Sequence, residues 1–165
     1  MEIRQLNSMD AGQYQNLRLE ALQKDPEAFA SSYEEEKEYS LETYVNRLKS
    51  DDVFTYGAFL NDKLCGVVTL VRETKRKTRH KATIFAMYVS PEIRKMGVGK
   101  RLMKAAIEKA KQMGGVEQIN LTVVSTNESA KKLYHFYGFE TFGLEERSEK
   151  VDQTYYDEEY MVLFL

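Results

Sequence analysis

The stretch Ile84–Met113 decides the fold of this chain, and it reads IFAMYVSPEIRKMGVGKRLMKAAIEKAKQM. Its first part is aromatic and apolar and ends at Pro91, a pattern that predicts a buried strand. Its last part has apolar residues at helical spacing, namely Leu102, Met103, Ala106, Ile107, Ala110 and Met113. Gly114-Gly115 then suits a C-terminal helix cap. The loop between strand and helix contains Gly97 and Gly99, and this order of elements can present backbone N–H groups to a phosphate.

Basic residues surround the two glycines. No Asp or Glu lies between Ile93 and Lys104, where the charged residues are Arg94, Lys95, Lys100, Arg101 and Lys104. Cations at the positive end of a helix cost a few tenths of a kcal/mol each, unless an anion is bound there. The sequence therefore predicts an anion-binding loop, and the alternative is a solvated basic face on an ordinary surface helix.

Two nucleotide-binding motifs are excluded by single residues. The Rossmann fingerprint needs a third glycine where Leu102 stands. A Walker A loop needs glycine in place of Arg94 and serine or threonine in place of Arg101. The pattern that fits is Arg94-x-x-Gly97-x-Gly99.

This pattern resembles the acyl-CoA loop of the GNAT family of N-acetyltransferases, in which successive backbone amides hold the pyrophosphate of coenzyme A. A second block strengthens the resemblance. It consists of Asn127-x-x-Ala130-x-x-Leu133-Tyr134 followed by Tyr137-Gly138-Phe139. The two blocks and their flanking elements cover about half of the chain. The resemblance implies a fold in which the fourth and fifth strands splay apart and admit the pantetheine arm of acetyl-CoA.

The resemblance also implies roles for individual residues. The pyrophosphate would lie on the loop formed by Arg94, Lys95, Met96, Gly97, Val98, Gly99 and Lys100. A backbone amide late in the fourth strand, at Tyr88 or Val89, would polarise the thioester carbonyl. Asn127 would bind the pantetheine arm, although the same side chain also suits a helix N-cap. Tyr134 would protonate the departing thiolate, and its alternative is a core aromatic residue.

No general base is assigned. Some members of the family use a glutamate on the fourth strand, but Thr83–Val89 contains no carboxylate. Other acids on segments that could border the acceptor pocket are Glu34, Glu35, Glu36, Asp157 and Glu158. A water chain would also serve. The acidic run Glu34–Glu38 is a weak hint of a cationic amine, because charged runs are usually solvated.

Composition limits the remaining choices. The 165 residues suggest a single domain spanning 1–165, and the net charge of −2 argues against general nucleic-acid binding. Cys65 is the only cysteine, and no Cys/His spacing suggests a metal site, so no metal is expected. The N-terminal Met-Glu-Ile-Arg lacks the apolar region typical of a signal peptide, and no apolar run is long enough to span a membrane, so the cytoplasm is the expected location.

The remaining pattern predicts an α/β fold. Strands are expected at 2–6, 53–60, 64–71, 119–124, 139–144 and 155–165, besides the strand before Pro91, with a hairpin turn at Asn61-Asp62-Lys63. Further helices are expected after Asn7 or Ser8, after Ser40, and after Ser125, which begins a Ser-x-x-Glu capping box. Phe29–Glu38 is expected to be irregular. This order predicts a mixed, mostly antiparallel central sheet with helices on both faces, the acyl-CoA N-acyltransferase fold of the resemblance.

Three functions agree with these features. The first is an acetyltransferase that moves the acetyl group of acetyl-CoA directly to a primary amine of a small molecule or a peptide. The second is an acyl-CoA-binding sensor or regulatory module without turnover. The third is an adaptor for an anionic partner through the basic segment Lys75–Lys81, for which a solvated hairpin tip is the alternative. The sequence leaves a homodimer open.

Overall fold

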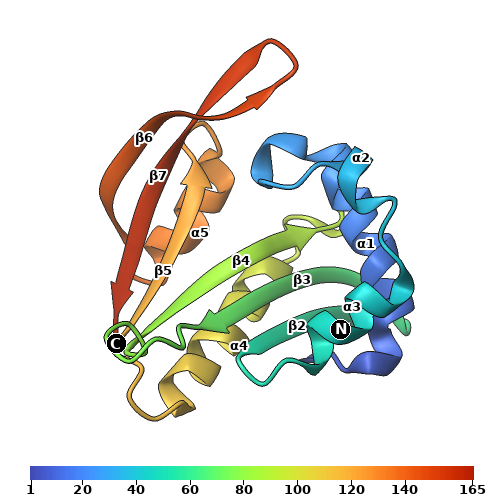
Figure 1. Ribbon diagram of the computed structural model, residues 1–165, viewed down its shortest axis with the longest axis horizontal. Helices are drawn as coiled ribbons and strands as arrows, with labels where there is room; N and C mark the ends of the chain where they lie inside the picture. The colour runs from blue at the N-terminus through green and yellow to red at the C-terminus, as the bar shows by residue number, and fades with distance from the viewer.

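Seven strands form one sheet in the computed structural model, which describes residues 1–165 (Figure 1). The strands are β1 (Glu2–Gln5), β2 (Val53–Leu60), β3 (Lys63–Arg72), β4 (Lys81–Val89), β5 (Gln118–Val124), β6 (Glu140–Val151) and β7 (Thr154–Phe164). Their order across the sheet is β1-β2-β3-β4-β5-β7-β6. Only the β4–β5 pair is parallel, and the other neighbours are antiparallel.

Helices cover both faces of this sheet. They are α1 (Ala11–Lys24), α2 (Tyr33–Glu36), α3 (Leu41–Lys49), α4 (Val98–Gln112) and α5 (Glu128–Phe136), with short 3-10 helices η1 (Ser8–Asp10), η2 (Pro26–Ala28) and η3 (Pro91–Ile93). Figure 1 shows α3 in front of β2 and α4 behind the strands, and α1 shares a core with α3, β2 and β3. The predicted mixed, mostly antiparallel sheet with helices on both faces is therefore confirmed. None of the helices has the length and apolar character needed to cross a membrane.

A separate hydrophobic core lies on each face. Leu102, Met103 and Ala106 of α4 are fully buried against the sheet, as their helical spacing predicts. On the opposite face, the α1 residues Leu17 and Leu22 are buried among side chains that also come from α3, β2 and β3. The two cores fix the sheet between the helix layers.

The sheet opens between β4 and β5. These strands pair only at Lys81–Thr83 with Gln118–Asn120, and then they diverge (Figure 1). A β-bulge follows on β4, where the register with β3 slips by one residue and Ala86 has a positive φ of 53°. The splay implied by the resemblance is confirmed.

Three local expectations were wrong. The strand expected at 139–144 continues to Val151, so that only two residues connect β6 to β7. The other two errors involve short-range hydrogen bonding. Asn127, and not Ser125, caps α5, because its side chain accepts the Ala130 N–H at 3.1 Å. The segment expected to be irregular contains α2, whose capping box joins Ser32 to Glu35. The predicted hairpin turn is confirmed, with positive φ values of 50° and 62° at Asn61 and Asp62.

Candidate functional site

The loop before α4 presents unpaired backbone amides. Lys95 and Gly97 have φ values of 69° and 78°, and this left-handed backbone turns the chain sharply into the helix. The first backbone bond of the helix runs from Arg101 N–H to the Gly97 carbonyl. The amides of Val98, Gly99 and Lys100 consequently have no acceptor in the chain. Together with the positive helix end, they form a site that fits an anion such as a pyrophosphate.

Glycine is needed at positions 97 and 99 of the loop for different structural reasons. A Cβ atom at Gly97 would meet no atom within 4 Å, so the space above it is open for a ligand. A Cβ atom at Gly99 would lie 3.2 Å from Leu133 of α5 and 3.2 Å from Met87 of β4. Gly99 therefore allows α4 to approach α5 and β4 closely, a packing role that the motif alone does not reveal.

Most of the basic side chains around the loop have partners within the chain. Arg101 donates to the Met1 carbonyl at 3.0 Å, and Lys104 lies 3.8 Å from Glu108. The Lys100 ammonium lies 3.9 Å from the centre of the Phe136 ring. Lys95 is exposed and has no acidic partner. The predicted concentration of basic charge is thus present, but only part of it is free for an anion.

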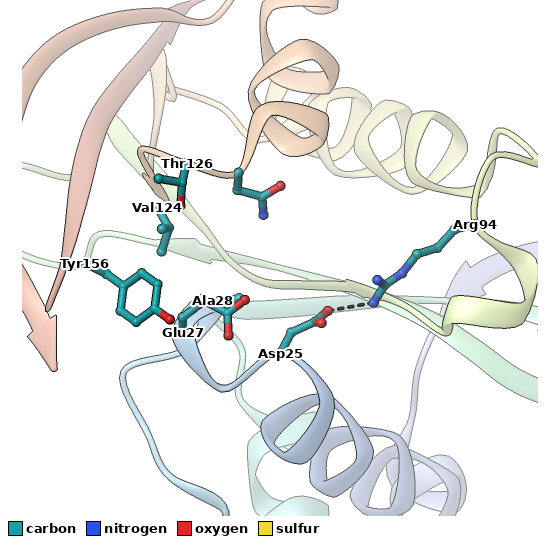
Figure 2. A pocket seen from close by; sticks show the side chains of 8 residues that line it. Asp25, Glu27, Ala28, Arg94, Val124, Thr126 and Tyr156 are labelled. Atoms are coloured by element: carbon teal, nitrogen blue, oxygen red, sulfur yellow. Dashed lines mark hydrogen bonds and ion pairs between the residues drawn. The ribbon is translucent and has the colours of Figure 1, made fainter. Parts of the chain in front are cut away.

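The Arg94 side chain lines a cavity of about 270 Å³ beside this loop. Its Nε donates to the Val89 carbonyl at 2.8 Å, and one Nη donates to Asp25 Oδ2 at 2.6 Å. Figure 2 shows the guanidinium pointing toward Asp25, with Tyr156 and Thr126 on the opposite side of the cavity. Since Asp25 follows α1 and Arg94 precedes α4, the ion pair connects two elements far apart in the sequence.

Asn127 lines the same cavity. Its Oδ1 accepts the Ala130 N–H in the cap of α5, whereas its Nδ2 makes no hydrogen bond within the chain. The two predicted roles are therefore compatible, since the cap uses the oxygen and leaves the nitrogen available to a ligand.

The direction of the β4 amides favours one of the two residues predicted to polarise the thioester. The Ser90 N–H donates to the Cys65 carbonyl of β3 at 2.9 Å. Successive amides of a strand point to alternate sides, so the Tyr88 N–H faces β3 and the Val89 N–H faces the gap toward β5. The Tyr88 side chain is buried and donates to Glu20 at 2.9 Å, and burial together with this hydrogen bond raises the pKa of the phenol.

Tyr134 is buried on α5 and packs against Phe139, with 6.0 Å between the ring centres. Burial raises the pKa of its phenol to about 12. Its hydroxyl makes no hydrogen bond within the chain, yet no fully buried side-chain oxygen lacks a partner. The hydroxyl must therefore reach a point accessible to solvent or ligand. Tyr134 does not line the cavity of Arg94 and Asn127.

The acids considered as bases lie in different environments. Glu36 is fully buried, and it accepts hydrogen bonds from Arg18, Arg47 and Tyr44. Burial alone would raise its pKa, but the two guanidiniums outweigh this effect and lower the pKa. Glu36 therefore has a structural role as the partner of two arginines. It is not available to bind a cationic amine, as the acidic run Glu34–Glu38 had suggested. Glu34 is exposed, and Glu35 caps α2.

Glu158 lies in an acidic group on the β6–β7 hairpin, close to η2. It accepts from Ser148 at 2.9 Å and faces Glu149. Burial, Glu158 and the nearby Glu27 raise the pKa of Glu149 to about 7. Asp157 accepts the Arg147 N–H at 2.8 Å. No arrangement of three or more His, Cys, Asp or Glu side chains is suited to a metal ion.

Some residues of the cavity were not predicted from the sequence. Asp25, Glu27 and Ala28 reach it from the end of α1 and from η2, and Tyr156 reaches it from β7. From the sequence, Asp25-Pro26 indicated only the end of a helix, because Arg94, the partner of Asp25, is 69 residues away. The basic segment Lys75–Lys81 lies at the β3–β4 connection, beside the paired ends of β4 and β5 and away from Arg94.

Comparisons with known proteins agree with this geometry. The model of the acetyltransferase (GNAT) family matches residues 17–139. A GNAT-family acetyltransferase structure from Streptococcus pneumoniae is 26% identical, with 99% of each chain covered and a TM-score of 0.85. A ribosomal-protein-alanine N-acetyltransferase from Brucella melitensis has the same fold at 19% identity, with full coverage of both chains and a TM-score of 0.86.

A third similar structure was solved with its cofactor. It is a putative acetyltransferase from Salmonella typhimurium with acetyl-CoA, 16% identical, covering 99% of this chain and 93% of that one, with a TM-score of 0.87. No curated protein matches the sequence.

Proposed function

The chain belongs to the GNAT family of acetyltransferases, and we propose that it transfers the acetyl group of acetyl-CoA directly to a primary amine of a small molecule or peptide. One observation carries the proposal, namely the unpaired amides of Val98, Gly99 and Lys100 beside the opening between β4 and β5. An anion-binding helix end next to an opened sheet suits a ligand that combines a pyrophosphate with a narrow, extended arm. Acetyl-CoA is such a ligand, and it supplies a reactive acetyl thioester.

The loop residues Arg94, Lys95, Met96, Gly97, Val98, Gly99 and Lys100 would hold the pyrophosphate, mainly through backbone N–H groups. Binding would require Arg94 to share its guanidinium between Asp25 and the phosphate oxygens, or to leave Asp25. Asn127 Nδ2 would donate to the extended arm. The Val89 N–H, which faces the gap, would donate to the thioester carbonyl oxygen as negative charge develops there.

Proton transfer completes the chemistry. Tyr134 would hold a proton at its hydroxyl and donate it to the departing sulfur, which suits a phenol of high pKa. The amine must reach the site neutral. Glu158 pairs with Val124 at the end of β5 and faces Glu149, and a carboxyl pKa of about 7 at Glu149 suits a group that accepts a proton near neutral pH. No residue is singled out as the base.

The experiment is an acceptor screen that follows release of free thiol from acetyl-CoA. Purified protein is incubated with acetyl-CoA and a panel of amino acids, polyamines, aminoglycosides and peptides. Acetyltransferase activity predicts acceptor-dependent thiol release. The acetylated product should be heavier than the free amine by roughly 42 mass units, because an acetyl group replaces one hydrogen on nitrogen. Tight binding of acetyl-CoA without release for any amine would instead indicate a binding module without turnover.

A further inference from the structure

A second and larger cavity, of about 590 Å³, lies on the α1/α3 face of the sheet. Its wall on β4 is formed by Phe85 and by Ala86, the residue of the bulge. Ala86 lies three residues from Val89, a distance of about 10 Å along a strand. The cavity therefore adjoins the stretch of β4 that borders the proposed acetyl-transfer site. The roles proposed for acetyl-CoA use none of its lining residues.

The charged residues that line this cavity are both arginines, Arg18 of α1 and Arg47 of α3. Their partner is the fully buried Glu36. Arg18 donates Nε and one Nη to Glu36 Oε2, at 3.0 Å and 2.8 Å, and Arg47 donates one Nη to Oε1 at 2.9 Å. One carboxylate against two guanidiniums leaves one uncompensated positive charge at the cavity.

Several guanidinium donors remain available. The second Nη of Arg18 has no acceptor in the chain, and neither do Nε and the second Nη of Arg47. Because no buried side-chain nitrogen lacks a partner, these donors are accessible. Both guanidiniums are held in place from another side as well. Arg18 lies 4.9 Å from the Phe29 ring centre, and Arg47 lies 5.0 Å from that of Tyr44. The free donors, one Nη of Arg18 and the Nε and second Nη of Arg47, are thus held in place for an anion.

The rest of the wall suits a small molecule with both polar and apolar parts. Thr43 and Asn46 of α3 and Ser50 at its C-cap contribute hydroxyl and amide groups, and no Asp or Glu lines the cavity. Phe85 offers an apolar surface that is 53% exposed. The volume falls within the usual range of about 300–1,000 Å³ for small-molecule sites.

We propose that this cavity binds a carboxylate of the acceptor through Arg18 and Arg47, so that the substrate class is a small amine carrying a carboxylate. The proposal rests on the proposed acetyl transfer and specifies its acceptor. A cationic second group would be repelled by the uncompensated charge. Because Arg47 keeps Nε and one Nη free and Arg18 keeps one Nη, a carboxylate would be bound by directed hydrogen bonds as well as by charge.

The test compares acceptors that differ only in charge. A series of ω-amino carboxylates from glycine to 5-aminopentanoate, with the α-amino acids, is compared with the corresponding amides and diamines. Thiol release from acetyl-CoA is measured at low salt. We expect the carboxylates to have kcat/KM values about tenfold or more above those of the amides and diamines, as expected for a charge-assisted contact. Amides or diamines that react as well as the carboxylates would overturn the proposal.

Asn46→Asp tests the site without disturbing Glu36. Asn46 is exposed on α3, and an aspartate of the same size there cancels the positive charge of the cavity. The KM for the carboxylate acceptor should rise about tenfold and the rise should shrink with added salt, while the KM for acetyl-CoA stays unchanged. Gln112→Glu, at the end of α4 on the other face, adds the same charge and should change neither KM. An unchanged acceptor KM in Asn46→Asp would contradict the proposal.

A binding experiment separates this proposal from the proposed function. N-acetylated amino acids, which mimic the product, are titrated into ¹⁵N-labelled protein with coenzyme A present. Saturable amide shifts in Thr43–Ser50 and at Phe85 and Ala86, weakened in Asn46→Asp, would support the carboxylate site even if no amine were acetylated. In that case acetyl transfer fails and the anion site stands. Absence of these shifts for every probe overturns the site, whatever the outcome of the acceptor screen.

Discussion

Tyr134 allows a clean test of a single hydroxyl, because that hydroxyl has no hydrogen-bond acceptor in the chain. Tyr134→Phe keeps the ring that packs against Phe139 and removes only the proton donor. Turnover at saturating acetyl-CoA should fall about 10²-fold or more, the usual scale for a positioned acid. The free energy of unfolding should change by less than about 1 kcal/mol, since no protein hydrogen bond is lost. Steady-state rates and urea unfolding of the same samples provide the two measurements.

The control for this variant is its thermal stability and its affinity for acetyl-CoA, both of which should match those of the parent. If Tyr134→Phe turns over as fast as the parent, a pre-steady-state transfer rate should be measured next. An unchanged transfer rate would remove the hydroxyl from the mechanism and leave Tyr134 as a core aromatic residue.

Asp25 should act against cofactor binding through Arg94. Their 2.6 Å ion pair occupies a guanidinium that the acyl-CoA motif assigns to the pyrophosphate. Asp25→Asn removes the competing charge, so we expect acetyl-CoA to bind a few-fold more tightly, a small effect because both side chains are partly exposed. Arg94→Ala should weaken binding, and both effects should shrink at high salt. Calorimetry at two salt concentrations measures them.

An opposite result for Asp25→Asn would be informative. Weaker binding would mean that Asp25 orients Arg94 for the ligand instead of withholding it. Glu27→Gln is a matched control, since Glu27 lines the same cavity without pairing with Arg94.

Single-residue roles could be predicted only where they depend on neighbours in the sequence. The strand–loop–helix order around Gly97 is a local feature, and the left-handed φ of 78° at this glycine agrees with a sharp turn into the helix. The cap role of Asn127 is likewise local, whereas its contact with the pantetheine arm stays a prediction. The environment of Glu36 could not be predicted, because Arg18 and Arg47 lie 18 and 11 residues away and are brought to it by helix packing.

At the level of elements, the β6–β7 hairpin carries a pH-sensitive pair. Burial and the charge of Glu158 raise the pKa of Glu149 to about 7, from an unfolded value near 4.5. The folded state therefore holds this proton more tightly than the unfolded chain does. Its stabilising contribution is complete below about pH 4.5 and is lost as pH rises through 7.

Glu149→Gln should remove this dependence. At pH 8 the variant should be more stable than the parent by about 1 kcal/mol, a value reduced for solvent screening, and at pH 4 the two should be alike. Urea unfolding across this pH range checks the difference. Glu146→Gln, an exposed change on the same strand, is the control, and a parent–variant difference that does not vary with pH would contradict the assignment.

The regular elements followed from hydrophobic periodicity, and the exceptions have physical causes. Helix α4 presents its predicted apolar residues to the core because its pattern repeats for four turns. Helix α2 is only four residues long, too short for any periodic signal. The splay of β4 and β5 came from the resemblance alone, since local patterns do not report where two strands stop pairing.

For the molecule as a whole, bound acetyl-CoA should contact both parts of the sheet and stabilise them against unfolding. β1–β4 and β5–β7 share backbone pairing only over Lys81–Thr83 and Gln118–Asn120. Acetyl-CoA at 100 times its Kd should add about 2.7 kcal/mol to the free energy of unfolding. For a chain of this length the melting temperature should then rise by roughly 5–10 °C. Differential scanning fluorimetry measures the shift, with acetate as a control that lacks the pyrophosphate.

Hydrogen exchange locates the same effect. Amides after Thr83 on β4 and after Asn120 on β5 should both become protected when acetyl-CoA binds. Protection on one strand only would show that the ligand does not lie between them.

The opening between β4 and β5 also places a sheet edge inside the molecule. Exposed edges recruit foreign strands and lead to aggregation, so proteins usually cover or charge them. Here the outer strand β6 carries Glu140, Glu145, Glu146, Arg147 and Lys150, which discourage such pairing. The inner edge has α5 and η2 beside it, which suits a thin, extended molecule with its own amide groups better than a whole strand of another protein. The unpaired backbone groups of the inner edge are thus available to the ligand, while the neighbouring elements shield them from strands of other proteins.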